Sequence, residues 1–328
     1  MMRAINWQVG RSVVAATAWA LIVYSSSAPA QLWPMKTITT IVPLGAGSAS
    51  DIMARVVMDQ VSRQVGQTVV IENRPGAGGT IGAGMVAKAA PDGYTVLAYG
   101  ALATAHALYA KLPYDTLKDF VPVIPFGIQP LVIVTAPGKY KTLGDLIAAG
   151  KANPGALNYT TAGVGSASHF GAERLLVSGE FKAQHIPFKG ASEAVTEVVA
   201  GRADFSVQLF TTTIPLIHEG KLAALAVSAT KRVSIMPELP TTLEAGLAGD
   251  SVHPFYSGLF LPARTPRDIV ARLHDEAAKA MQTPAVRDRF KQLGVEPMPM
   301  TLQQFDRFFR DDVDAAVKIV KAANIPQQ

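Results

Sequence analysis

The chain has 328 residues, of which 49% are hydrophobic and 17% are charged. This is enough apolar material for folded cores, which excludes a disordered or fibrous polypeptide, and the length suits two domains of about 150 residues each with a cleft between them. The net charge is +5, but Lys and Arg are scattered rather than gathered in runs, so nucleic acid is not an expected partner. The chain has no Cys, which rules out disulfides, a lipid-modified N-terminal cysteine and thiolate metal sites.

The N-terminus has the three parts of a secretory signal peptide. Arg3 and Arg11 supply positive charge, residues 13–24 form an apolar stretch too short to span a bilayer, and Ala28-Pro29-Ala30 has the small-x-small pattern of a cleavage site. We therefore expect cleavage after Ala30 and a mature protein in the periplasm that begins at Gln31. The alternative, an uncleaved membrane anchor, requires a longer apolar stretch.

From residue 38 onward, short β-rich runs alternate with helical patterns, as in parallel α/β domains. The first unit has strands predicted at 38–42, 68–72 and 95–99. A helical pattern over 52–61 follows the first strand, and a glycine-rich segment at 76–84 begins a second helix. The order of this unit is therefore β-α-β-α-β.

A second unit of the same kind follows, with strands predicted at 131–134, 157–160, 203–207 and 224–228 and a helix around 214–217 between the last two. After a last strand at 257–261, helices are expected to begin near Pro266, Pro284 and Thr301. No strand remains for these helices to cover in the second unit, so we expect them to pack on the first domain.

The predicted organisation is a signal peptide at 1–30, a first domain at 31–131 plus 254–328, and a second domain at 132–253. Each domain has a central sheet, and the chain crosses between the domains twice.

Two loops that join a strand to a helix have similar compositions. Loop 1 (residues 43–51) and loop 2 (residues 161–169) are rich in Gly, Ala and Ser and contain no Lys or Arg. Small residues let a ligand approach the backbone, and N–H groups at a helix N-terminus attract anions without a cationic side chain. Alternatively, these residues are ordinary helix caps, with Ser50 or Asp51 capping the first helix and Ser168 the second. Their occurrence at the same place in two units favours a ligand site, because open α/β sheets bind ligands at the carboxyl ends of strands.

Signatures of enzymes are missing from the sequence. Neither glycine-rich segment has the spacing of a nucleotide-binding loop, there is no Gly-x-Ser-x-Gly elbow, and His218-Glu219 is followed by Leu222 where a zinc protease needs a second His. We therefore expect no cofactor, no metal and no enzymatic activity. His169 lies in the first turn of the helix after loop 2, where it either orients a ligand or braces the loop.

Several motifs taken in order resemble the Bug, or TctC-like, substrate-binding proteins of tripartite tricarboxylate transporters. The matching segments are Trp33-Pro34, Ile41-Val42-Pro43, Gly45 to Asp51, Glu72 to Gly79, Ala90 to Tyr94, Lys111 to Asp115, Ala152 to Gly155, Gly163 to His169, Pro187 to Gly190 and Pro284 to Arg287. The resemblance implies a two-domain periplasmic-binding-protein fold of the Venus flytrap type II class, which closes by hinge motion on a small organic carboxylate. It further implies delivery of the ligand to membrane permease subunits by a protein that we expect to be a monomer.

Carried over by position, the two loops form the two jaws of the site. The residues that the resemblance implies for ligand binding are Leu44, Gly45, Gly47, Ser48 and Ser50 in loop 1, and Thr161, Ala162, Gly163, Ser166, Ser168 and His169 in loop 2. Gln208 joins them as a neutral residue where relatives often carry a polar pair that includes Asp. A buried ammonium group would then have no partner, so we expect a di- or tricarboxylate or an aromatic acid without an amino group. The stretch Tyr99 to Leu102, more polar in relatives, indicates either an apolar cleft or packing between the domains.

Two other functions stay open at this point. The loaded protein could signal to a receptor kinase instead of serving uptake. An exported serine hydrolase would use Ser48 or Ser166 as its nucleophile and His169 as its base.

Overall fold

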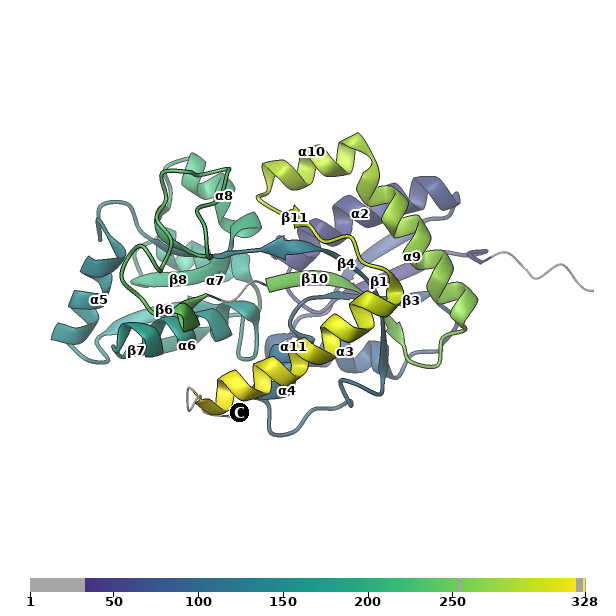
Figure 1. Ribbon diagram of the computed structural model, residues 1–328, viewed down its shortest axis with the longest axis horizontal. Helices are drawn as coiled ribbons and strands as arrows, with labels where there is room; N and C mark the ends of the chain where they lie inside the picture. Colours follow the sequence, from purple (N-terminus) through teal and green to yellow (C-terminus); the bar gives the residue numbers. More distant parts are fainter. Residues whose placement is uncertain (1–32, 253–254, 323–326, 328) are drawn as a thin grey trace, which may run out of the picture. The chain divides into compact units, whose positions relative to one another are not determined.

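The computed structural model describes residues 33–252, 255–322 and 327, and the chain from Lys36 onward forms one compact unit (Figure 1). The predicted signal peptide and its cleavage site lie outside the described residues. None of the helices in these stretches is long and apolar enough to cross a membrane.

Sheet A has six strands, in the order β11-β4-β10-β3-β1-β2. Strand β1 pairs in parallel with β2 and β3, whereas β10 is antiparallel to both β3 and β4. The bounds are β1 Ile38–Val42, β2 Val69–Asn73, β3 Thr95–Tyr99, β4 Phe120–Gln129, β10 Phe255–Pro262 and β11 Glu296–Pro297.

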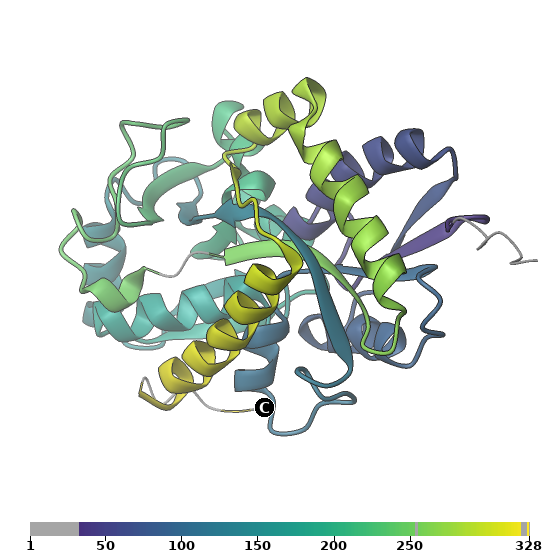
Figure 2. The same cartoon turned by 45° about the vertical axis from the view of Figure 1, so that its right-hand side comes forward.

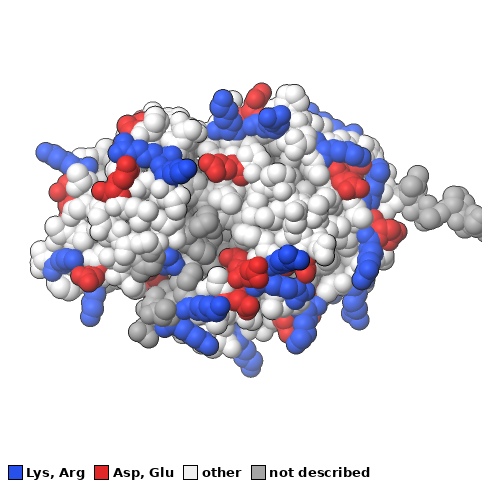
Figure 3. All heavy atoms as spheres, viewed as in Figure 1, with Lys and Arg blue, Asp and Glu red and all other residues white. Residues whose placement is uncertain are grey.

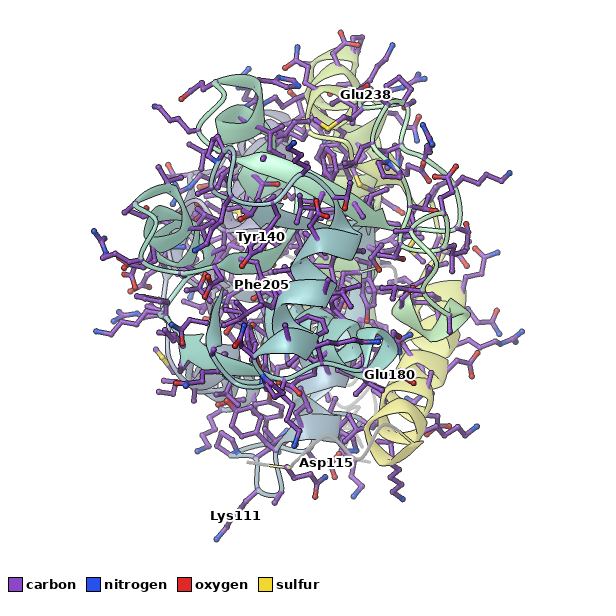
Figure 4. All side chains as sticks on the ribbon, turned by 90° about the vertical axis from the view of Figure 1, so that its left-hand side faces the viewer. Lys111, Asp115, Tyr140, Glu180, Phe205 and Glu238 are labelled. Carbon is purple, nitrogen blue, oxygen red and sulfur yellow. The ribbon has the colours of Figure 1, made fainter. Side chains whose placement is uncertain are left out.

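Sheet B has five strands, in the order β7-β6-β8-β5-β9. Strand β6 is parallel to β7 and β8, and β5 is antiparallel to β8 and β9. The bounds are β5 Leu131–Thr135, β6 Leu157–Thr161, β7 Ala183–Pro187, β8 Phe205–Leu209 and β9 Ala223–Ser228. In Figure 4, which faces this part of the molecule, Phe205 of β8 lies in the interior and Lys111 projects outward.

The chain passes from sheet A to sheet B between β4 and β5, and it returns between β9 and β10. These are the two expected crossovers, while the domain limits at residues 131 and 254 stay a prediction.

The helices are α2 Ala49–Val65, α3 Thr80–Ala87, α4 Leu102–Leu108, α5 Leu143–Ala152, α6 Ala167–Gly179, α7 Ala191–Val199, α8 Phe210–His218, α9 Arg267–Gln282, α10 Pro284–Gln292 and α11 Leu302–Ala322, with short 3-10 turns η1 Ala77–Gly79 and η2 Gly249–Ser251.

The C-terminal helices pack on the elements of sheet A, as the sequence predicts. Helix α9 contacts α2 and β4, and α11 contacts α4 and β4, which Figure 2 shows from the side. Phe305 and Phe309 of α11 lie one helical turn apart, and both rings contact Phe260 of β10, with centroids 5.5 and 5.1 Å away. This apolar stripe fixes α11 on the sheet.

Both sheets are mixed, whereas the alternation of strands and helices in the sequence is typical of parallel α/β domains. The strands that enter antiparallel, β10 and β5, are those at which the chain has just crossed between the sheets. Strand β4 was not predicted because Pro122 and Pro125 interrupt it, and proline normally argues against an interior strand. Here the register shifts between β4 and β10 accommodate the two prolines.

Candidate functional site

Helices α2 and α6 begin with the same local structure. Ser48 and Ser166 are the N-caps, with extended backbones at φ −67°, ψ 158° and φ −73°, ψ 163°. Their side chains accept hydrogen bonds from the N–H groups of Asp51 and His169. The capping alternative that named Ser50, Asp51 and Ser168 is therefore wrong, because each helix is capped by the serine that precedes its first helical residue.

Ser50 and Ser168, which do not cap the helices, have other partners. Ser50 accepts a hydrogen bond from the hydroxyl of Ser257 at 3.0 Å, and Ser168 accepts one from the N–H of Ala162 at 2.8 Å. Both serines are at most 5% exposed. Ser50 thereby joins loop 1 to β10, and Ser168 joins the end of loop 2 to the start of that loop. Both bonds hold the two jaws in a defined shape.

A cavity, here called the central cavity, lies between the starts of these two helices. It is lined by Leu44, Ser48, Ala49, Ser50, Tyr99, Gly100, Ala101, Ala162, Ser166, Ala167, Ser168, Ala191, Gln208, Leu209, Thr212 and Tyr256. The free space inside it is about 30 Å³, room for one or two water molecules in this closed form. Among the described residues that line it there is no Lys, Arg, Asp or Glu.

The first two helical residues of both helices belong to this lining: Ala49 and Ser50 from α2, and Ala167 and Ser168 from α6. The N–H groups at these positions have no acceptor inside their own helices, and the positive end of each helix dipole lies at the same place. The cavity therefore offers two separate anion sites made of backbone, one on each side.

The sequence-predicted residues divide into two groups. Those that line the central cavity are Leu44, Ser48, Ser50, Ala162, Ser166, Ser168 and Gln208. Those that do not line it are Gly45, Gly47, Thr161, Gly163 and His169, although all five lie in the two loops. Their roles in binding stay predictions, and their observed contacts point to roles in shaping the loops.

Several loop amides are already bonded within the protein. The N–H of Gly47 donates to the carboxylate of Asp51 at 2.9 Å, and that of Gly163 donates to the hydroxyl of Thr161 at 3.2 Å. The hydroxyl of Thr161 in turn lies 2.6 Å from Nε2 of His185. The amides that remain for a ligand are thus mainly those of the helix starts rather than those of the whole loop.

Asp51 organises loop 1 from beneath. Asp51 is 2% exposed, and its carboxylate accepts hydrogen bonds from Gly47, Arg55 and Asn73. Burial alone raises the pKa of Asp51, but the hydrogen bonds from Arg55, Gly47 and Asn73 outweigh it and hold the pKa below its ordinary value. The side-chain amide of Asn73 also donates to the carbonyl of Leu44 at 3.0 Å, which fixes the start of the loop.

His169 braces loop 2 from behind. Its Nδ1 accepts a hydrogen bond from the N–H of Gly165 at 3.3 Å, its ring stacks on His185 with centroids 4.4 Å apart, and its Nε2 lies 3.6 Å from Glu173. Glu173 also accepts a hydrogen bond from the hydroxyl of Tyr159. Burial, assisted by the neighbouring His185, lowers the pKa of His169 to about 3, so the imidazole is neutral at physiological pH. Of the two roles open for His169, these contacts favour bracing.

The contacts of Ser166 and His169 are not those of a nucleophile and its base. The hydroxyl of Ser166 donates to the carbonyl of Gly163 at 2.6 Å and contacts Ser168 at 3.0 Å, while Nδ1 of His169 is occupied by Gly165. A serine hydrolase requires a bond between hydroxyl and imidazole, which neither contact supplies.

Part of the cavity wall was missed in the sequence. The apolar cleft suggested for Tyr99 to Leu102 is present in part, since Tyr99, Gly100 and Ala101 line the cavity. Ala191, Leu209, Thr212 and Tyr256 complete the lining from α7, β8, α8 and β10. None of these four stands in a motif, and only the tertiary fold brings them to the site. Ala49 and Ala167 could have been found as the residues that follow a serine cap.

Direct contacts close loops 1 and 2 against the opposite elements. The hydroxyl of Tyr109 donates to the carbonyl of Val164 at 2.7 Å, and Ser192 donates to the carbonyl of Ala46 at 3.1 Å. A Cβ added to Gly190 would lie 3.1 Å from the Cα of Gly45, so only glycines let these two backbones approach so closely. The structure is that of a shut clamp.

On the face seen in Figure 3, surface charge does not mark a site of its own. Figure 3 shows Lys and Arg interspersed with Asp and Glu over one face, without a large area of a single sign. Together with the uncharged cavity, this locates the anion-attracting groups in the backbone rather than in side chains.

Comparison with known proteins agrees with the motifs. The family model for the receptor of the tripartite tricarboxylate transporter family, TctC, matches residues 53–325. A UPF0065 protein in the tcbD-tcbE intergenic region of Pseudomonas sp. (strain P51) is 35% identical over 307 residues, which are 92% of this chain and 91% of that protein.

Two solved structures have the same fold. MatC from Rhodopseudomonas palustris with bound malate is 31% identical with a TM-score of 0.84, covering 88% of this chain and 100% of its own. An R. palustris protein solved with adipate is 28% identical with a TM-score of 0.86, covering 90% of this chain and 100% of its own. The predicted two-domain α/β fold of periplasmic binding proteins is confirmed. The chain belongs to the TctC family of tripartite tricarboxylate transporter receptors, as its motifs predicted.

Proposed function

We propose that this protein is a periplasmic solute-binding protein that captures a small organic carboxylate for a tripartite tricarboxylate transporter and catalyses no reaction. The observation that carries the proposal is that the first two residues of both α2 and α6 line one cavity, whose described lining has no charged side chain. Such a cavity suits an anion that is held at two points.

The ligand class follows from the same lining. Two anion sites on opposite sides favour a molecule with two carboxylates, and the malate and adipate held by the two solved relatives are both diacids. The side chain at position 208 is a neutral Gln whose amide donates to Ser206 at 2.8 Å. Nothing charged is therefore available for an ammonium group, and we propose a di- or tricarboxylate, or an aromatic acid, without an amino group.

The remaining parts of the proposal concern place and partners. We include four further points in the proposal. The protein is exported by the segment that ends at Ala30, and its two domains meet near residues 131 and 254. It acts as a monomer and delivers its ligand to membrane permease subunits. Family membership supports these points, and each can be checked on the purified protein or with the permease.

The test removes single ligand-facing amides without changing the rest of the site. Proline lacks the N–H, fits the first helical position, and already occupies it at Pro284 of α10. The extended backbones of the caps before Ala49 and Ala167 suit a following proline. Ala49→Pro and Ala167→Pro should each weaken diacid binding by about 10- to 100-fold, since a hydrogen bond to a charged group contributes about 1.5–3 kcal/mol.

Binding is measured by calorimetry over a panel of diacids and triacids, with unfolding followed in parallel. Arg267→Pro is the matched control, because it places proline at the exposed first position of α9, away from the cavity. Unchanged affinity in both alanine variants would show that the helix starts do not hold the ligand. Failure of the wild-type protein to bind any carboxylate would overturn the proposed function.

A further inference from the structure

The hydroxyl of Thr212 differs from every other polar group in the central cavity. Thr212 lies in α8 and lines the cavity, and its Oγ1 is buried without a hydrogen-bond partner. Buried hydroxyls are nearly always bonded, so an unbonded one calls for an explanation.

The other polar side chains of the lining all have partners within the protein. These are Ser48 with Asp51, Ser50 with Ser257, Tyr99 with Gly78, Ser166 with Gly163, Ser168 with Ala162, Gln208 with Ser206, and Tyr256 with Asp312. Among the described lining residues, Thr212 alone keeps its full hydrogen-bonding capacity.

The sequence around Thr212 supplies an internal comparison. Thr211 and Thr213 flank it in the same helix and are fully buried, and both are bonded: Thr211 donates to the side chain of Gln129 at 2.6 Å, and Thr213 donates to the carbonyl of Phe210 at 3.3 Å. A threonine in a helix ordinarily bonds back to a carbonyl one turn earlier. Thr212 faces the cavity and makes no such bond.

We propose that Thr212 determines specificity by binding a neutral polar substituent, a hydroxyl or an oxo group, on the carbon chain of the captured diacid. This inference rests on the proposed function. The two helix starts supply the donors for the carboxylates, so the threonine hydroxyl is left for a third group. With both carboxylates held by the helix starts, a third polar group on the same diacid is an uncharged one. The ligand class becomes a hydroxy- or oxo-substituted dicarboxylate.

The test uses two acids that differ by a single hydroxyl, malate and succinate, and measures the affinity of each by calorimetry. The wild-type protein should bind malate about threefold to tenfold more tightly, the ratio that one net hydrogen bond between neutral groups produces. Thr212→Val keeps the shape of the side chain and removes the hydroxyl, so it should reduce that ratio to about one. Thr212→Ser keeps the hydroxyl and should preserve the preference.

A second measurement separates recognition from a structural role. Removing a buried hydroxyl that has no partner should leave the melting temperature of the unliganded Thr212→Val protein unchanged or raise it, whereas loss of a structural bond would lower it. Equal affinities of the wild-type protein for malate and succinate, or a Thr212→Val protein that still prefers malate, would overturn the role of Thr212 and leave the proposed function standing. Binding of neither acid, nor of any other carboxylate, would overturn the proposed function itself.

Discussion

Acid should destabilise this protein through His169, and the effect can be separated from those of the other titrating groups. The ordinary pKa of histidine is 6.5, and burial next to His185 lowers that of His169 to about 3. Between these values the unfolded chain binds a proton that the folded chain does not, so the free energy of unfolding falls as the pH falls below about 6.5. The stabilising contribution is complete above pH 6.5 and is lost by about pH 3.

The magnitude follows from the shift. At pH 4.5 the unfolded imidazole is protonated and the folded one is not, a difference of two pH units that corresponds to about 2.7 kcal/mol. The side chain of His169 is only 5% exposed, so solvent screens little of this effect. Protonation of Nδ1 would also remove the acceptor for the N–H of Gly165. An acid-destabilised protein should therefore lose the shape of loop 2 as well.

The assay compares urea unfolding of the wild-type protein and His169→Asn at pH 7 and pH 4.5. Asparagine does not titrate, and its Oδ1 can replace Nδ1 as the acceptor, so the variant should lose about 2–3 kcal/mol less on acidification. Burial also lowers the pKa of His185, to about 4, and raises that of Glu173. Both groups are present in the wild-type protein and in the variant, so their contributions largely cancel when the two losses of stability are subtracted. An identical loss of stability on acidification in the wild-type protein and in His169→Asn would refute the reasoning.

Three further predictions concern closure and charge. Gly190→Ala adds a Cβ that lies 3.1 Å from the backbone of loop 1, so calorimetry should show several-fold weaker diacid binding. Gly144→Ala is the control and should bind diacids normally, because the nearest atom to its added Cβ is 3.6 Å away. Tyr109→Phe removes a 2.7 Å hydrogen bond to loop 2, and the resulting rise in the dissociation constant should be about 2- to 10-fold. Gln208→Glu places a negative charge in a cavity whose described lining has no cation. Diacid binding should fall by more than about 100-fold and recover as the pH is lowered and the new carboxylate is protonated. Unchanged binding at pH 7 would contradict the location of the site.

The sequence by itself determined the local structures and the family. Strands 38–42 and 95–99 were located to the residue, and the two serine-containing loops were recognised as equivalent, because strand patterning and helix starts depend on neighbours only a few positions away. The glycine positions in those loops were also informative. Gly47 and Gly163 have φ angles of +76° and +112°, a backbone that other residues adopt with strain.

Tertiary structure alone decided which donors face the ligand. Both loops looked like continuous rows of amides, but Asp51 and Thr161 use some of those amides, and His169 turned away from the cavity to hold Gly165. Thr212, which completes the lining of the cavity, lies in a helix that no sequence motif marks. These outcomes depend on contacts between segments far apart in the chain, and on strands that enter antiparallel after each crossover. No pattern of neighbouring residues encodes such distances, so the cavity exists only once both sheets have assembled.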